Sequence, residues 1–200
     1  AAAAGEESLG AAAGVPFPFL ALLTSGGHLQ LLLCEDVGRF SVLGGTLDDA
    51  FGEAYDKVAR MLGLDVGGGG GPAVEALARE GDPAAVRLPV PMQSKPGCDF
   101  SFSGLKNAFR MAAERSAAAH GIESAAALPR ARKADLAAAF QDVGIKHLEQ
   151  RLRRAMRLCA EERGVHRLAV VGGVAANQEL RRRLEALCAA ETARAPGRPG

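Results

Sequence analysis

Residues 19–36 constrain the fold most strongly, because two apolar runs flank a short turn that contains two glycines. The turn reads Ser25-Gly26-Gly27-His28, and two strands joined by a glycine-containing turn are typical of a β-hairpin. Since both runs are almost continuously apolar, we expect strands that are buried on both faces of a sheet. Bare glycines also let backbone amides approach an anion. The turn is therefore either a plain connection or a ligand-binding tip.

Other short apolar segments predict further strands. Residues 39–43 can add a third strand that ends at two glycines, and the alternation in residues 100–102 predicts a short strand of its own. Residues 168–171 read as a short buried strand near the end of the chain. Helical patterns lie between these segments, so the sequence predicts an α/β fold.

A helix is predicted to start at Thr46, whose hydroxyl can cap it, with Asp48 and Asp49 in the first turn. Apolar residues recur along it at spacings of three and four, which predicts one buried stripe: Leu47, Ala50, Phe51, Ala54, Val58, Met61 and Leu62. Ser103 can cap a later helix. The predicted helices after the first span residues 72–80, 105–119, 131–163 and 178–190, and the prolines of residues 86–98 predict a loop.

Asp56 lies off this apolar stripe. Glu53 with Lys57, and Asp56 with Arg60, have the i,i+4 spacing of solvated ion pairs. Alternatively, Asp56 points into a cleft and binds a hydroxyl group of a ligand. The five glycines of residues 67–71 are either a flexible linker or a place where the backbone approaches a ligand closely.

The segment Gly172-Gly173-Val174-Ala175-Ala176-Asn177 follows the last predicted strand and precedes a helix. A strand, a glycine turn and a helix can expose helix amides to a nucleotide. The spacing fits neither a dinucleotide fingerprint nor a P-loop. Asn177 is either the cap of the following helix or a ligand contact.

Charge gives little information about partners, since the net charge is +1. Lys106 and Arg110 form an i,i+4 basic pair, a weak indication of an acidic partner. The long predicted helix is locally basic, which indicates either a solvated surface or an RNA contact; its cations are Lys146, Arg151, Arg153, Arg154 and Arg157. His147 and His166 have no second ligand at metal-binding spacing, so they are interpreted as packed or surface residues.

Four separated cysteines indicate neither a zinc site nor a disulfide framework, and they favour a reducing compartment. No apolar run reaches transmembrane length, so no membrane partner is expected. Residues 1–14 are interpreted as a disordered or artefactual N-terminus, and residues 191–200 as a flexible tail.

Four motifs resemble one family when they are taken in order: Ser25-Gly26-Gly27-His28, the segment from Asp48 to Lys57, the segment from Phe100 to Lys106, and residues 172–177. The family is that of the tRNA N6-adenosine threonylcarbamoyltransferases. The resemblance implies an actin-like, sugar-kinase-like ATPase fold of two ribonuclease-H-like lobes. Residues 15–190 resemble the second lobe, incomplete at both ends. The implied reaction transfers threonylcarbamoyl from threonylcarbamoyl-adenylate to N6 of the adenosine next to the anticodon in ANN-decoding tRNAs.

The resemblance also implies the residues that bind the ATP-derived adenylate. The loop for its phosphate and acyl groups would be Leu23, Thr24, Ser25, Gly26 and Gly27. Asp56 would bind the ribose hydroxyls, Gly71 would lie beside the nucleoside, and Asn177 would contact it from the far side. The glycine loop is longer than is usual in the family, which leaves the register of Gly71 open. No catalytic acid or base is assigned.

The resemblance further implies one divalent metal ion of the iron or zinc type. Its ligands in the family are a His-x-x-x-His pair before the hairpin and an Asp near the C-terminus, and neither motif occurs in this sequence. We therefore expect a truncated chain that binds ligand weakly and catalyses little. The alternative is a non-catalytic, nucleotide-binding or partner-binding isoform. A sugar or acetate kinase fits less well, because the catalytic carboxylate and the first-lobe phosphate loop of such kinases are not found.

The implied partners are tRNA and an adenylate-forming enzyme that supplies the intermediate, with a homodimer or accessory subunits as further options. Residues 90–92 and 98–102 resemble organellar members of the family. The mitochondrion is therefore the expected compartment, with a plastid or the bacterial cytoplasm as alternatives.

Overall fold

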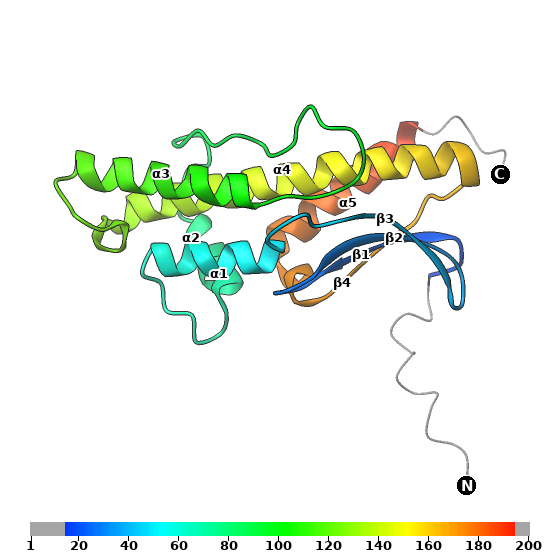
Figure 1. The fold of residues 1–200 in the computed structure, drawn as a ribbon, viewed down its shortest axis with the longest axis horizontal. Coiled ribbons are helices and arrows are strands. Elements are labelled where there is room, and N and C mark those ends of the chain that lie inside the picture. The colour runs from blue at the N-terminus through cyan, green and yellow to red at the C-terminus, as the bar shows by residue number, and fades with distance from the viewer. Residues whose placement is uncertain (1–14, 195–200) are drawn as a thin grey trace, which may run out of the picture.

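A four-stranded sheet with helices packed against it forms the mixed α/β structure (Figure 1), which is a computed structural model describing residues 15–194. The strands are β1 (Phe19–Thr24), β2 (Leu29–Asp36), β3 (Arg39–Gly45) and β4 (Leu168–Val171), in the order β3-β2-β1-β4. β4 pairs with β1 in parallel, and the other pairs are antiparallel. The predicted hairpin is confirmed. The predictions for residues 1–14 and 195–200 lie outside the described residues.

Five α-helices and two short 3₁₀ turns are described in the same part of the chain. They are α1 (Phe51–Met61), α2 (Gly70–Ala78), α3 (Ser103–Ala119), η2 (Ala125–Ala127), α4 (Arg130–Arg163), η3 (Gly173–Ala176) and α5 (Gln178–Arg194). The 34 residues of α4 give it a length of about 50 Å. Figure 1 shows α4 running along the whole molecule, with α5 beside its C-terminal half. α5 ends at Arg194, four residues beyond its predicted end at residue 190, so the first four residues of the predicted tail are helical.

The sheet is well buried on one face only, contrary to the expectation of two buried faces. Residues along β1 alternate between full and partial burial, and β2 begins in the same way. On the less covered face, Phe40 and Val42 of β3 are 61% and 59% exposed. Continuous apolar runs predict burial on both sides, but the helices in the described part of the chain cover one side of the sheet.

α1 begins at Phe51 rather than at Thr46, so the predicted capping role of Thr46 is wrong. The Thr46 hydroxyl instead donates to the carbonyl oxygen of Asp49 at 2.7 Å, within a turn. Leu47 is 65% exposed and does not belong to the buried stripe, whereas Val58 is fully buried, as predicted. The stripe therefore starts one turn later than the sequence indicates.

Asp48 caps a helix that is distant in the sequence. Its Oδ1 accepts hydrogen bonds from the backbone amides of Phe102 at 2.8 Å and Ser103 at 3.2 Å, at the start of α3. Such bonds satisfy amides that the first turn of a helix leaves unpaired. Ser103 is therefore the first residue of α3, and its side chain does not cap that helix.

Residues 100–102 do not form a strand. They make one isolated bridge, between Thr46 and Phe100. The predicted alternation is present, because Phe100 and Phe102 are fully buried and Ser101 between them is partly exposed. The ring of Phe102 stacks on Phe51 of α1 with 4.7 Å between centroids. Phe51 also lies against the ring of Phe140 of α4. An aromatic cluster thus joins α1, α4 and the start of α3.

Arg151 of α4 holds the loop of residues 86–98, which has no helix or strand, as predicted. The side chain is 3% exposed. Its guanidinium donates to the carbonyl oxygens of Lys95 at 2.8 Å and Gly97 at 3.0 Å, and also to that of Met92. A planar fork of donors is well suited to gather several carbonyl groups in this way.

His147 is fully buried between the rings of Phe100 and Phe102. Its Nε2 accepts a hydrogen bond from the Ser101 amide at 3.2 Å, so the imidazole is neutral in the folded chain. Burial, assisted by the charge of Arg151, lowers the pKa of His147 to about 4.

His147 should make folding sensitive to acid. Because its pKa is about 6.5 in the unfolded chain and about 4 in the folded one, the unfolded state binds more protons between these values. The free energy of unfolding should fall by about 1.4 kcal/mol for each pH unit in that window as the pH is lowered. Urea denaturation from pH 7 to pH 4 should show a shallower decline for His147→Gln. His166→Gln, at an exposed position, is the control, and parallel profiles for all three proteins would contradict this role.

Candidate ligand-binding site

The tip of the hairpin between β1 and β2 is closed by two hydrogen bonds. The Ser25 amide donates to the His28 carbonyl at 2.9 Å, and the His28 amide donates to the Ser25 hydroxyl at 3.1 Å. Gly26 and Gly27 lie exposed between them, and their amides donate to no group within residues 15–194. Two free backbone N–H groups next to each other can receive an anionic oxygen.

Glycines beneath the tip bring three backbone segments into direct contact. A side chain at Gly52 of α1 would meet the Ser25 carbonyl oxygen at 2.6 Å, so the first turn of α1 packs against the tip. A side chain at Gly172, which follows β4, would lie 2.2 Å from the carbonyl oxygen of Thr24. These contacts place the hairpin tip between the start of α1 and the turn that leads to α5.

Thr24 is the most enclosed of the predicted loop residues, with no exposed surface. Its hydroxyl makes no hydrogen bond within the described part of the chain. An unpaired buried hydroxyl commonly costs about 1–3 kcal/mol, so its presence at this tip is notable. Leu23 points away, to the less covered face of the sheet, opposite Gln30 and Val171.

Asp56 lies four residues after Gly52 on α1, and residues with this spacing share a side of a helix. Its Oδ1 accepts a hydrogen bond from the Gly70 amide at 2.8 Å, at the start of α2. The predicted ion pair with Arg60 is not formed; Lys57, in contrast, pairs with Glu53 at 2.8 Å, as predicted. One side of α1 therefore carries both the hairpin tip and the Asp56 carboxylate.

The glycine run ends in the first turn of α2, which begins two residues earlier than predicted. A side chain at Gly70 would meet the Cα of Asp56 at 2.5 Å, whereas one at Gly71 would meet nothing within 4 Å. Gly70 is therefore required for packing. Gly71 is the next residue, is partly exposed, and leaves space beside the helix start.

Asn177 uses both atoms of its side-chain amide inside the protein. Its Oδ1 accepts from the Leu180 amide at 2.8 Å and caps α5, as one of the two interpretations of the sequence predicted. Its Nδ2 donates to the Oε1 of Gln141 at 3.0 Å. The same oxygen accepts the Tyr55 hydroxyl at 3.2 Å. Sequence reasoning missed Gln141, although a polar residue next to the buried stripe of α4 was a possible signal.

Glu75 is a second residue that the sequence did not single out. Its Oε1 accepts the backbone amide of Gln178, the first residue of α5, at 2.9 Å. Glu75 lies on α2 and is only 9% exposed, and it also pairs with Arg79. The starts of α2 and α5 are thereby tied together next to Asn177.

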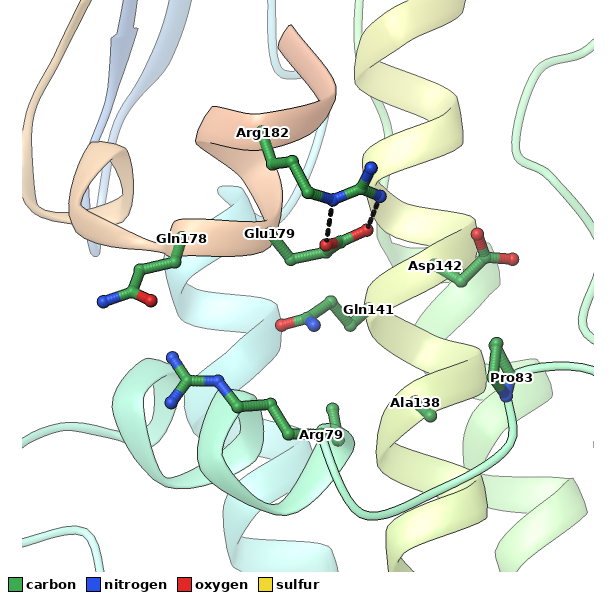
Figure 2. Close-up of a pocket in the computed structure, with 9 residues that line it drawn as sticks. Arg79, Pro83, Ala138, Gln141, Asp142, Gln178, Glu179 and Arg182 are labelled. Atoms are coloured by element: carbon green, nitrogen blue, oxygen red, sulfur yellow. Dashed lines mark hydrogen bonds and ion pairs between the residues drawn. The ribbon is translucent and has the colours of Figure 1, made fainter. Parts of the chain in front are cut away.

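A pocket of about 470 Å³ opens between α2, α4 and α5 (Figure 2). Gln141 and Asp142 line it from α4, and Gln178 from α5. Figure 2 shows Arg182 paired with Glu179 at the pocket, with 2.7 Å between the Arg182 Nη2 and the Glu179 Oε1. The pocket lies beside Asn177 and shares Gln141 with it.

The basic side chains of α4 are engaged inside the chain. Arg153 and Arg157 both pair with Glu191 of α5, at 3.3 Å and 2.9 Å. Lys146 pairs with Asp142 at 2.6 Å, and Arg154 donates to loop carbonyls. These contacts favour a structural role for the basic run over an RNA contact.

Lys106 is likewise engaged, so it does not indicate an acidic partner. Its Nζ lies 2.6 Å from Asp49, which also pairs with Lys57 at 2.7 Å. Burial alone would raise the pKa of Asp49, but the two lysines outweigh it and lower that pKa. Arg110 pairs with Glu114 on the same helix at 2.7 Å.

Within residues 15–194, no three His, Cys, Asp or Glu side chains lie together in a group that could hold a metal ion. This part of the chain therefore does not fit the divalent ion that the resemblance implies. None of its helices has the length and apolar character needed to cross a membrane.

The chain is a mixed α/β protein. It carries a candidate site for an anionic, hydroxyl-bearing ligand, formed by the glycine-lined hairpin tip, the Asp56 carboxylate and the strand–turn–helix at Asn177. A family model described as TsaD, tRNA N6-adenosine threonylcarbamoyltransferase, matches residues 2–197. The chain belongs to that family.

Curated relatives carry the same name. A tRNA N6-adenosine threonylcarbamoyltransferase of Paramagnetospirillum magneticum is 53% identical over 169 residues, which are 84% of this chain and 46% of the relative. That of Rhodospirillum rubrum is 51% identical over 170 residues, 84% of this chain and 44% of the relative. A probable tRNA N6-adenosine threonylcarbamoyltransferase of Arabidopsis thaliana, named mitochondrial, is 46% identical over 171 residues. These residues are 84% of this chain and 36% of the relative. The chain thus spans less than half the length of these relatives.

Gly52→Ala should displace the hairpin tip, because the added methyl group would meet backbone atoms of Ser25 and Gly26 that cannot rotate away. We expect the free energy of unfolding to fall by about 1–3 kcal/mol, measured by urea denaturation. Gly104→Ala is the matched control, since Gly104 lies in α3 with open space around it and should gain helix propensity. Equal stability of Gly52→Ala and the unchanged chain would show that the tip is not held as described.

Proposed function

We propose that this chain binds the adenylate portion of threonylcarbamoyl-adenylate and takes part in threonylcarbamoyl transfer to tRNA. The observation that carries the proposal is the family match over residues 2–197, together with relatives of the same name at 46–53% identity. The arrangement of the hairpin tip, Asp56 and Asn177 supports it.

The fold that we infer is one lobe of an actin-like, sugar-kinase-like ATPase fold, with residues 15–190 as the second lobe. Family membership supports this inference. So does a sheet in which three antiparallel strands are followed by a fourth strand that lies parallel to the first.

Each site residue has a role that suits its chemistry. The free amides of Gly26 and Gly27 bind the phosphate, and the unpaired hydroxyl of Thr24 lies buried at the end of β1 that leads into the tip. Asp56 keeps its Oδ2 available for the ribose hydroxyls while Oδ1 holds Gly70. Gly71 leaves room beside the nucleoside, and Asn177 bounds the site at the start of α5.

The proposed reaction forms one bond and breaks another. The N6 amine of the tRNA adenosine attacks the threonylcarbamoyl carbonyl carbon, the bond from that carbon to the phosphate oxygen breaks, and N6 loses a proton as AMP leaves. An adenylate-forming enzyme supplies the intermediate, and a homodimer or accessory subunits complete the assembly. We assign the iron- or zinc-type ion of the complete enzymes to ligands outside residues 15–194 and derive no step through it.

The compartment that we propose is the mitochondrion. The relative from Arabidopsis thaliana is named mitochondrial, and the sequence of residues 98–102 resembles that of organellar members of the family. Bacterial relatives at 53% and 51% identity support the bacterial cytoplasm as the alternative, beside a plastid. Immunofluorescence of the endogenous protein against a mitochondrial marker tests the assignment.

Asp56→Ala should weaken the binding of AMP by about tenfold or more, because a partly buried, charged acceptor for two ribose hydroxyls is lost. Calorimetric titration of the 200-residue chain with AMP measures this. Asp65→Ala is the matched control, because Asp65 is an exposed carboxylate of the loop that follows α1, and its Oδ1 accepts a hydrogen bond from the Gly67 amide at 3.0 Å. The AMP affinity of Asp65→Ala should equal that of the unchanged chain.

Two results would contradict the proposal. If the unchanged chain gives no heat with AMP at millimolar concentration, it does not bind the adenylate, and an interaction module without nucleotide is favoured. If Asp56→Ala and Asp65→Ala bind AMP equally well, the nucleotide lies elsewhere.

A further inference from the structure

Gln141 occupies a junction between three helices. It lies on α4, is 6% exposed, and its Oε1 accepts the Tyr55 hydroxyl of α1 at 3.2 Å and the Asn177 Nδ2 of α5 at 3.0 Å. Figure 2 shows its side chain extending away from α4. One buried oxygen atom thus joins α1, α4 and α5.

The direction of these bonds is fixed by the backbone. The Leu180 amide can only donate, so the Asn177 atom that it contacts is the oxygen. The other amide atom of Asn177 is then the nitrogen, a donor, and Gln141 must present its oxygen to it. Burial raises the pKa of Tyr55, so its hydroxyl stays protonated and donates as well. No other rotation of the two amides satisfies all three donors.

Asn177 is itself a proposed ligand contact, whereas the ring of Tyr55 is buried against Phe51 and Phe140. The Gln141 oxygen therefore lies behind Asn177, at the start of α5. A side chain in this place fixes the orientation of the Asn177 amide.

We propose that Gln141 is a positioning residue of the nucleotide site, which holds the Asn177 amide in the orientation that meets the ligand. This inference rests on the proposed function, because it assumes that the adenylate contacts Asn177. Gln141 acts through Asn177 and does not itself touch the reacting atoms.

The test measures AMP affinity by calorimetry for single and double variants. Gln141→Met, which has a similar shape but no acceptor, should weaken AMP binding about tenfold. The double variant Gln141→Met/Asn177→Ala should bind within twofold of Asn177→Ala alone, because both changes remove one interaction. Gln141→Glu keeps an oxygen for both donors and should bind within about threefold of the unchanged chain.

Tyr55→Phe separates positioning from general stability. It removes the other hydrogen bond to the same oxygen but leaves the Asn177 bond in place, so its AMP affinity should stay within twofold of the unchanged chain. Urea denaturation of each variant shows whether it is folded. If Gln141→Met does not fold, the comparison of Gln141→Glu with Tyr55→Phe decides, and a tenfold loss in either folded variant overturns the proposal.

The outcomes distinguish this inference from the function on which it rests. If Asp56→Ala and Asn177→Ala weaken AMP binding but Gln141→Met does not, the positioning role is wrong and the site stands. Multiplicative losses in the double variant overturn the positioning role in the same way. If Asp56→Ala and Asn177→Ala bind AMP as the unchanged chain does, the proposed site is wrong and the role of Gln141 falls with it.

Discussion

Backbone contact without an intervening side chain is the constraint on which the candidate site depends. Gly52 brings α1 against the hairpin tip, Gly70 brings α2 against Asp56, and Gly172 brings the β4 turn against Thr24, each at a distance that a methyl group would violate. Because interiors are close-packed, such contacts fix relative positions more tightly than long side chains do. The free amides of the tip and the Asp56 carboxylate are consequently held on one side of α1.

Local patterns in the sequence predicted the elements that rely on local physics. The hairpin of residues 19–36, the β4 strand and the 34-residue α4 all follow from apolar periodicity and turn glycines, and all were found close to their predicted bounds. The capping role of Asn177 was also predicted, as one of two interpretations, because cap chemistry involves only the next three residues.

Features that depend on distant partners could not be predicted from one sequence. Asp48 reads as part of its own helix but caps α3, which starts 55 residues later. Lys106 reads as a free cation but is neutralised by Asp49 of an earlier segment. Gln141 reads as an unremarkable polar residue of α4, and only the approach of α1 and α5 gives it two donors. The family resemblance supplied the candidate site residues, whereas the residues that support them required the structure.

The hydrogen bonds from Arg151 to the loop of residues 86–98 affect which substitutions this surface can accept. The guanidinium binds carbonyl groups, which every amino acid carries, so these bonds do not depend on the identities of the exposed residues 93–96. Substitutions at those four positions can therefore accumulate almost neutrally as long as the arginine remains. Lysine could not replace it, because a single ammonium group lacks the planar fork that reaches three carbonyls. Val86 and Cys98, which are buried at the two ends of the loop, do not share this freedom.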